Sequence, residues 1–180
     1  MPVAPHTPDL EGLQTLDAQF VSQIHDRFFP ELYRYAYFRT GDPATAEDVA
    51  SETFLRLIEA LRIGRGPQRH LRGWLFGTAR HLVEDHFRRH YARAEEPLPE
   101  HLAGDDHDPV ELSEENDARR DIRTALARLT SDQQDVLALR FHLGLSVAEV
   151  AGILGKKANA VKALQFRALT ALRKALEDSQ

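Results

Sequence analysis

The 180-residue sequence contains no cysteine, which excludes a disulfide framework and a zinc site built on thiolates. No apolar run approaches the roughly 20 residues that a membrane-spanning helix requires. The first 17 residues hold three acidic residues and no basic one, and they lack the basic start and apolar stretch of a signal peptide. These absences favour a soluble, cytoplasmic protein.

Motifs of catalysis are also missing. The sequence has no glycine-rich phosphate loop and no nucleophile elbow. The pair Asp105–Asp106 falls in a stretch expected to be disordered, which suits acid–base chemistry poorly. His86 and His90 have a spacing that can bind zinc on a helix, but no third ligand is evident. We therefore expect no enzyme, no resident metal and no cofactor.

The net charge of −5 averages segments of opposite sign. Residues 95–118 carry ten acidic side chains and no Lys or Arg. Residues 20–94 carry twelve basic and nine acidic side chains, and residues 119–180 carry eleven basic and six acidic ones. The acidic stretch has three prolines and no aromatic residue, so it buries too little apolar surface to offset chain entropy.

This pattern predicts an all-α protein of two small helical domains joined by a flexible acidic linker. The expected parts are a disordered tail (1–16), a first helical domain (17–94), the linker (95–118) and a helix-turn-helix domain (119–180). The linker is either a solvated spacer or a segment with a specific role.

The first domain is expected to contain three helices. A helix from Asp17 to Thr40 is rich in aromatic residues, and Pro30 predicts a kink or a break in it. Asp42 and Pro43 then provide a cap and a first position for the next helix. That helix has an apolar stripe and an outward polar face, which either is solvated or docks onto a basic partner surface. The face consists of Asp48, Ser51, Glu52 and Glu59.

A basic loop, residues 64–71, leads into the third helix, Arg72 to about Tyr91. Trp74, His81 and Arg88 are seven residues apart, so they share one face of this helix. An indole, an imidazole and a guanidinium beside a basic loop suit unstacked bases and phosphates. Because Trp74 alone would more often be a core residue, we expect a mixed role, with part of its ring buried.

Residues Leu145 to Leu176 predict a helix-turn-helix. Ser146 is placed to cap a short helix, and Gly155 supplies the tight turn because it tolerates positive φ. The next helix keeps an apolar stripe on one side and leaves a basic face with Phe166 outside it. A plain helical hairpin would show the same pattern, but a basic second helix favours binding in a DNA groove.

Three segments together resemble extracytoplasmic-function (ECF) sigma factors, the small two-domain members of the bacterial sigma family. They are AEDVASETFLRL (residues 46–57), LRGWLFGTARHLVEDHFRR (residues 71–89) and the C-terminal helix-turn-helix. The resemblance implies a protein that binds core RNA polymerase and promoter DNA, directs initiation and helps melt the duplex. It also implies an anti-sigma factor as a further partner. The lack of a long apolar run predicts no membrane insertion.

The resemblance assigns roles to residues. Asp48, Ser51 and Glu52 would bind core polymerase. The −10 strand would contact Arg65, Arg69, His70, Leu71, Trp74, Arg80, His81, Arg88 and Arg89. The −35 element would contact Lys157, Asn159, Lys162, Ala163, Phe166 and Arg167.

Some positions depart from the family pattern, which usually has Gln at position 51 and Asn at position 81. Lys157, Asn159 and Ala160 also replace commoner small hydroxyl and glycine residues, and we expect Asn159 to act as a substitute cap. Two other functions remain open. One is a conventional helix-turn-helix regulator with an N-terminal sensing or dimerisation domain, and the other is a protein that sequesters polymerase without reading promoters.

Overall fold

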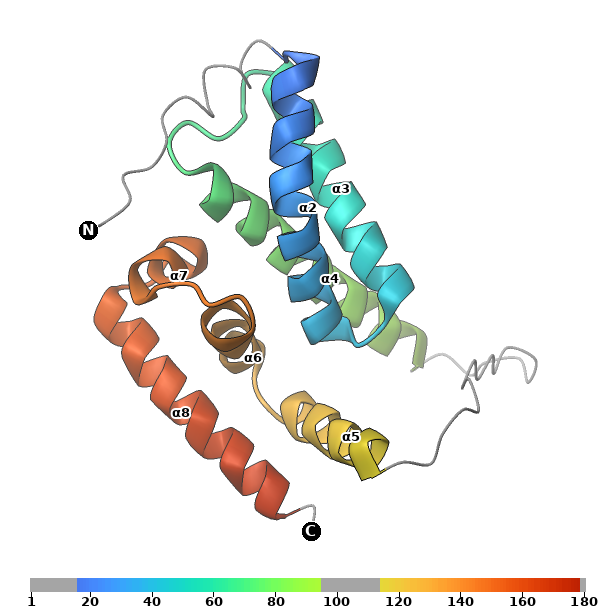
Figure 1. Cartoon of the computed structure of the whole chain (residues 1–180), viewed down its shortest axis with the longest axis vertical. Coiled ribbons are helices and arrows are strands. Elements are labelled where there is room, and N and C mark those ends of the chain that lie inside the picture. Colours follow the sequence, from blue (N-terminus) through green and yellow to red (C-terminus); the bar gives the residue numbers. More distant parts are fainter. Residues whose placement is uncertain (1–15, 95–113, 179–180) are drawn as a thin grey trace, which may run out of the picture.

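The computed structural model describes residues 16–94 and 114–178, and every regular element in these two ranges is helical. The predicted tail and most of the predicted linker lie outside the described residues. In the described part, no helix is both long and apolar enough to cross a membrane. Figure 1 shows the helices as two groups that lie against each other, which we call the N-terminal module (16–94) and the C-terminal module (114–178).

The N-terminal module consists of three long helices, α2 (Ala18–Thr40), α3 (Pro43–Arg62) and α4 (Leu71–Ala94). The Asp17 carboxylate caps α2, which ends at Gly41 with a φ of 71°. The helix runs through Pro30 without interruption, so the predicted break is wrong. Pro30 is exposed, and the flanking turns pack Phe28 and Leu32 into the core, which offsets the hydrogen bond that proline cannot donate.

The start of α3 follows the predicted capping chemistry. Asp42 accepts a hydrogen bond of 2.7 Å from the Thr45 backbone N–H, and Pro43 occupies the first helical position. Ala46, Ala50, Phe54 and Leu57 are buried. Because they recur at helical spacing, α3 turns one apolar side towards α2 and α4.

The C-terminal module contains α5 (Glu114–Ala127), α6 (Ser131–Leu137), a π-helical turn η1 (Ala138–His142), α7 (Val147–Leu154) and α8 (Ala158–Glu177). The helical part of this half therefore begins at Glu114, within the segment that the sequence assigned to the linker. Figure 1 shows α8 along the outer side of this module, away from α2 and α3. Val161, Leu164 and Ala168 of α8 are buried, and they pack with α6 and α7.

Candidate nucleic-acid interface

The turn between α7 and α8 is built as the sequence predicts. Ser146 accepts a hydrogen bond from the Glu149 backbone N–H at 3.2 Å, and the Glu149 carboxylate accepts one from the Ser146 N–H at 2.8 Å. This reciprocal pair satisfies two donors at the helix start. The Ser146 backbone N–H also holds the pKa of Glu149 below its ordinary value. Gly155 ends α7 at a φ of 62°, so the chain reverses tightly into α8.

The first turn of α8 differs from the expectation in one respect. Lys157 holds the N-cap position and makes no side-chain capping bond. Asn159 lies one residue inside the helix, so it is not the substitute cap. Its amide is exposed instead, on the surface that the sequence assigns to DNA.

The outward face of α8 is solvent-exposed and basic. Phe166 is 73% exposed, which is unusual for a phenylalanine because its ring is apolar. The other residues assigned to the −35 element are exposed as well: Lys157, Asn159, Lys162, Ala163 and Arg167. The fold thus gathers the whole predicted −35 set on one free surface.

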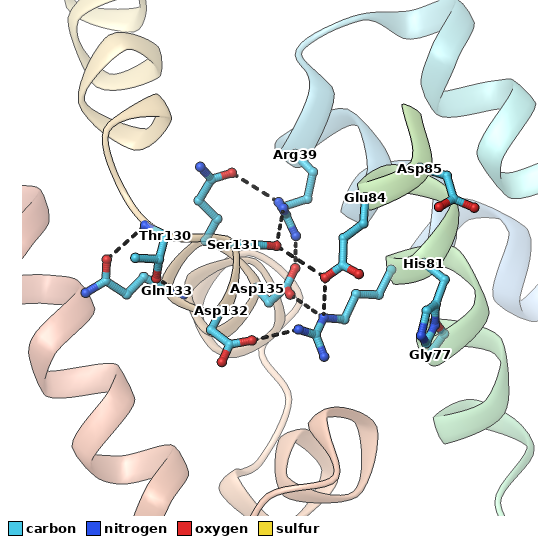
Figure 2. Close-up of polar contacts among 12 residues, drawn as sticks. Arg39, Gly77, His81, Glu84, Asp85, Thr130, Ser131, Asp132, Gln133 and Asp135 are labelled. Carbon is cyan, nitrogen blue, oxygen red and sulfur yellow. Dashed lines mark hydrogen bonds and ion pairs between the residues drawn. The ribbon is translucent and has the colours of Figure 1, made fainter. Parts of the chain in front are cut away.

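Most of the residues assigned to the −10 strand are exposed, some in the loop before α4 and others on α4 itself. Arg65, Arg69 and His70 are exposed in the loop before α4, and His81, Arg88 and Arg89 are exposed on α4 itself. Trp74 is partly buried and packs against the core, as expected for a mixed role. His81 Nδ1 lies 2.7 Å from the Gly77 carbonyl oxygen. In Figure 2, His81 lies on the side of α4 that faces away from Asp135.

Two of the assigned −10 residues have other surroundings. Leu71 is only 6% exposed and belongs to the core, so its side chain is not available to a DNA strand in this arrangement. Arg80 points towards the C-terminal module, where its guanidinium lies 2.7 Å from carboxylates of Asp132 and Asp135. Leu71 lies at helical spacing from Leu75, Ala79 and Leu82, which are buried too, whereas no local pattern indicates the surroundings of Arg80.

The residues assigned to core polymerase lie together on α3. Asp48 and Ser51 are exposed, and Glu52 is half-buried and pairs with Arg56 at 3.1 Å. They border an open groove between α3 and α4, whose other side carries His86 and Arg89. Leu55, which was not among the predicted site residues, is 56% exposed in this groove. Its position outside the apolar stripe of α3 was the signal that could have identified it.

A buried polar cluster between the modules was also missed. Tyr35 donates a hydrogen bond of 2.7 Å to Asp135, and Arg39 forms an ion pair with the same carboxylate. Burial raises the pKa of Tyr35 to about 12 and lowers the pKa of Arg39. Because Tyr35 and Asp135 are 100 residues apart in sequence, no local pattern predicts their contact.

His86 and His90, the two histidines with zinc-binding spacing, lie next to each other on α4. The His86 and His90 rings stack with their centroids 6.3 Å apart. Burial, followed by the neighbouring His90, lowers the pKa of His86. Within the described ranges, no group of three or more His, Cys, Asp or Glu side chains is arranged to hold a metal ion.

Comparisons with known proteins agree with this architecture. The family model described as Sigma-70 region 2 matches residues 24–93, and the one described as Sigma-70, region 4, matches residues 119–172. The chain is 38% identical over 174 residues to the ECF RNA polymerase sigma factor BldN of Streptomyces coelicolor, covering 94% of this chain and 65% of that protein. It is 30% identical over 170 residues to the ECF RNA polymerase sigma factor SigL of Mycobacterium tuberculosis, covering 94% of this chain and 96% of SigL.

The fold is similar to that of CnrH, solved in complex with the cytosolic domain of CnrY, with a TM-score of 0.66, 20% identity and coverage of 94% of this chain and 96% of CnrH. Two sigma-70 regions, matched in this order on two helical modules, define a protein of the sigma-70 class. The chain belongs to the ECF RNA polymerase sigma factors.

Proposed function

We propose that this chain binds core RNA polymerase and directs it to promoters, reading a −35 element with α8 and a melted −10 strand with α4 and the loop before it. The observation that carries the proposal is the match of both sigma-70 regions to the two modules. The exposed basic face of α8 supports it, because the second helix of a helix-turn-helix typically lies in the major groove.

At the −35 element, α8 would lie in the major groove with its outward face against the base edges. Lys162 and Arg167 supply donors for phosphates or for guanine acceptors. The exposed Phe166 ring offers apolar contact to a thymine methyl group. The buried stripe of α8 packs on α6 and α7, which leaves the opposite face of the helix exposed to DNA.

At the −10 element, the reaction is a physical opening of DNA and needs no catalytic residue or cofactor of the chain. Extruding a base costs a few kcal/mol, and stacking on an aromatic side chain returns about 1–3 kcal/mol per base. The partly exposed Trp74 and the exposed His81 ring offer aromatic surfaces for this stacking on α4. Arg65, Arg69, Arg88 and Arg89 would hold the backbone through phosphate contacts.

The polymerase would contact the exposed side of α3. Asp48 and Glu52 provide negative charge, Ser51 provides a short polar group, and Leu55 adds an exposed apolar side chain. This combination suits a partner surface that has basic residues around an apolar centre. The proposed function also implies action in the cytoplasm, where the polymerase works. An anti-sigma factor stays a prediction.

Transcription in vitro with purified core polymerase tests the proposal against its alternatives. A sigma factor makes core polymerase start at defined promoters. A conventional regulator needs a separate sigma factor for any effect, and a sequestering protein only inhibits. Failure of the chain to produce promoter-dependent transcripts with its own organism's core polymerase would overturn the proposal.

A further inference from the structure

The N-terminal and C-terminal modules meet through a layer of charged and polar side chains, which we call the module interface. It is formed by α2 and α4 on one side and by α6, η1 and α7 on the other. Figure 2 shows Arg39 and Glu84 on one side of it and Ser131, Asp132 and Asp135 on the other. Buried charges are costly unless they are paired, so each charged side chain buried in this layer needs a partner of opposite charge.

Asp135 is the centre of the module interface. Its side chain is fully buried, yet it belongs to the C-terminal module and its charged partners belong to the N-terminal module. Arg39 binds one carboxylate oxygen, together with the Tyr35 hydroxyl at 2.7 Å. Arg80 Nε lies 2.7 Å from the other oxygen. Both oxygens are thus neutralised by side chains that move away if the modules separate.

Further contacts surround this centre. Arg39 donates to Gln134 at 3.1 Å and to Ser131 at 3.0 Å. Arg80 also binds Asp132 at 2.7 Å. At the other end of the interface, Arg72 of α4 bridges Glu31 of its own module at 2.6 Å and Glu149 of α7 at 3.0 Å. Each arginine therefore links the modules through charge-assisted hydrogen bonds.

Apolar side chains also cross the module interface, because the buried hydrophobic residues of both modules form one continuous cluster. The rings of Phe38 and His142 lie 5.3 Å apart across this interface. An open cavity lies beside them, lined by Phe38 and Phe87 of the N-terminal module and by Arg123 and Leu126 of α5. The module interface therefore combines shared apolar packing with buried ion pairs and an open cavity. Contacts of this mixed kind are typical of modules that move relative to one another.

The module interface overlaps the proposed −10 surface. Arg80, assigned to the melted strand, is held by two carboxylates of α6. An arginine binds a carboxylate and a phosphate through the same forked N–H geometry. A DNA backbone must therefore displace Asp132 and Asp135 before it reaches Arg80, and α6 and α7 block approach to this side of α4.

We propose that Asp132 and Asp135 act as an internal substitute for nucleic-acid phosphate and hold the free chain in a closed form that masks Arg80 until the modules separate. The closed form is a property of the free chain, whereas its effect on promoter binding rests on the proposed function. Polymerase, which would engage both modules, would favour the open form by binding it more tightly.

Fluorescence energy transfer tests the closed form directly. The chain has no native cysteine, so Ala44→Cys and Thr124→Cys allow specific labelling of exposed positions on α3 and α5. These positions lie close in sequence to Gly41 and Arg123, which are neighbours in space, because a Cβ added at Gly41 would lie 3.4 Å from the Arg123 side chain. We expect efficient transfer in the otherwise unchanged chain and a clear loss of transfer with Asp135→Asn. Low transfer in the unchanged chain, or unchanged transfer in a folded Asp135→Asn variant, would overturn the proposal.

Two variants serve as controls for the transfer experiment. Asp178→Asn removes the same charge at an exposed position after α8 and should leave transfer unchanged. If Asp135→Asn fails to fold by circular dichroism, Asp132→Asn replaces it, because Asp132 is only half-buried. This variant should lose transfer in the same direction by a smaller amount, and no change would contradict the proposal.

Binding of a fluorescein-labelled single-stranded DNA of mixed sequence tests the masking. If the closed form holds about nine-tenths of the molecules, full opening improves apparent affinity about tenfold. We expect Asp135→Asn to show most of this gain in affinity. The double variant Asp135→Asn/Arg80→Ala should not show the gain. Opening without any gain would refute masking of Arg80. These readouts need no polymerase, so a failure here leaves the proposed function intact, and absent initiation with a normal closed form counts against the proposed function alone.

Discussion

Phe166 and Arg167 are adjacent, exposed residues on the outward face of α8. We propose that they contact the bases of the −35 element. An arginine paired with a guanine discriminates one base from another, whereas a lysine on phosphate does not. Individual side chains on this face should therefore differ in how they affect specificity.

Arg167→Ala should weaken binding of the polymerase holoenzyme to its preferred promoter by about 1–3 kcal/mol if Arg167 pairs with a base. The loss should nearly vanish on a promoter altered at the base pair that Arg167 contacts. Lys174→Ala, an exposed change in the last turn of α8, is the matched control and should have little effect. Equal losses on every promoter variant would show that Arg167 contacts only the backbone.

Residue roles could be predicted from the sequence only where they depend on local spacing. The exposed −35 set, the capping by Ser146 and the outward position of Asp48 and Ser51 follow from helical periodicity. The surroundings of Arg80 and Asp135 could not be predicted, because they depend on how two modules meet. Leu71 is the first residue of α4 and continues the buried stripe of Leu75 and Ala79, so helical spacing accounts for its burial. Its contact with the −10 strand stays a prediction.

At the scale of single helices, the turn between α7 and α8 determines how the reading surface is presented. Gly155 adopts a φ of 62°, and Gly152 lies in α7 with nothing within 4 Å of an added Cβ. These two glycines, three residues apart, offer a matched pair of substitutions to the same residue.

Gly155→Ala should lower the free energy of unfolding by about 1–2 kcal/mol, because a Cβ is strained in the left-handed region. Gly152→Ala should raise it by about 0.5–1 kcal/mol, because alanine favours a helix over glycine. Denaturant unfolding of the full chain measures both. Changes of opposite sign in the free energy of unfolding would support the left-handed conformation of Gly155. A stabilising Gly155→Ala would mean that the turn has another conformation.

The start of α7 should be sensitive to pH. The Ser146 N–H lowers the folded-state pKa of Glu149, with a further contribution from Arg72. A carboxyl with a lowered folded-state pKa stabilises the fold above its unfolded pKa, and that contribution is lost as the pH falls through the folded value. Glu149→Gln keeps a capping side chain but removes the charge, so it should lower the Tm at pH 7.

This difference in Tm should shrink as the pH is lowered, because the Glu149 carboxylate of the unchanged chain becomes protonated too. Glu177→Gln removes the same charge from the end of α8 and serves as the control. A difference for Glu149→Gln that is constant over the whole pH range would contradict the role of its charge.

The outward side of α3 is expected to bind polymerase. Glu52→Lys reverses a charge at its centre, so it should weaken binding to core polymerase by tenfold or more, about 1.4 kcal/mol. Asp26→Lys makes the same change in charge on α2, where the side chain is 78% exposed, and should leave affinity unchanged. Fluorescence anisotropy of the labelled chain measures both, and equal affinities for the two variants would exclude this face.

At the scale of the whole molecule, two helical modules share an interface that contains buried ion pairs, and we propose that each presents its own surface to DNA. The number and order of the N-terminal helices followed from the sequence, because proline, aspartate and the apolar stripes mark their ends and buried sides. The start of α5 at Glu114 could not be predicted from the sequence, because the acidic composition of this segment suggested a linker. The closed arrangement was also beyond sequence reasoning, since charge patterns do not show which carboxylate meets which arginine.

We propose that this chain selects the promoters at which core polymerase starts transcription. The most direct measurement is to map the 5′ ends of transcripts made in vitro on genomic DNA of the source organism by its core polymerase, with and without the purified chain. We expect new start sites that share two sequence blocks at a constant spacing upstream. The same set of start sites with and without the chain would contradict this proposal.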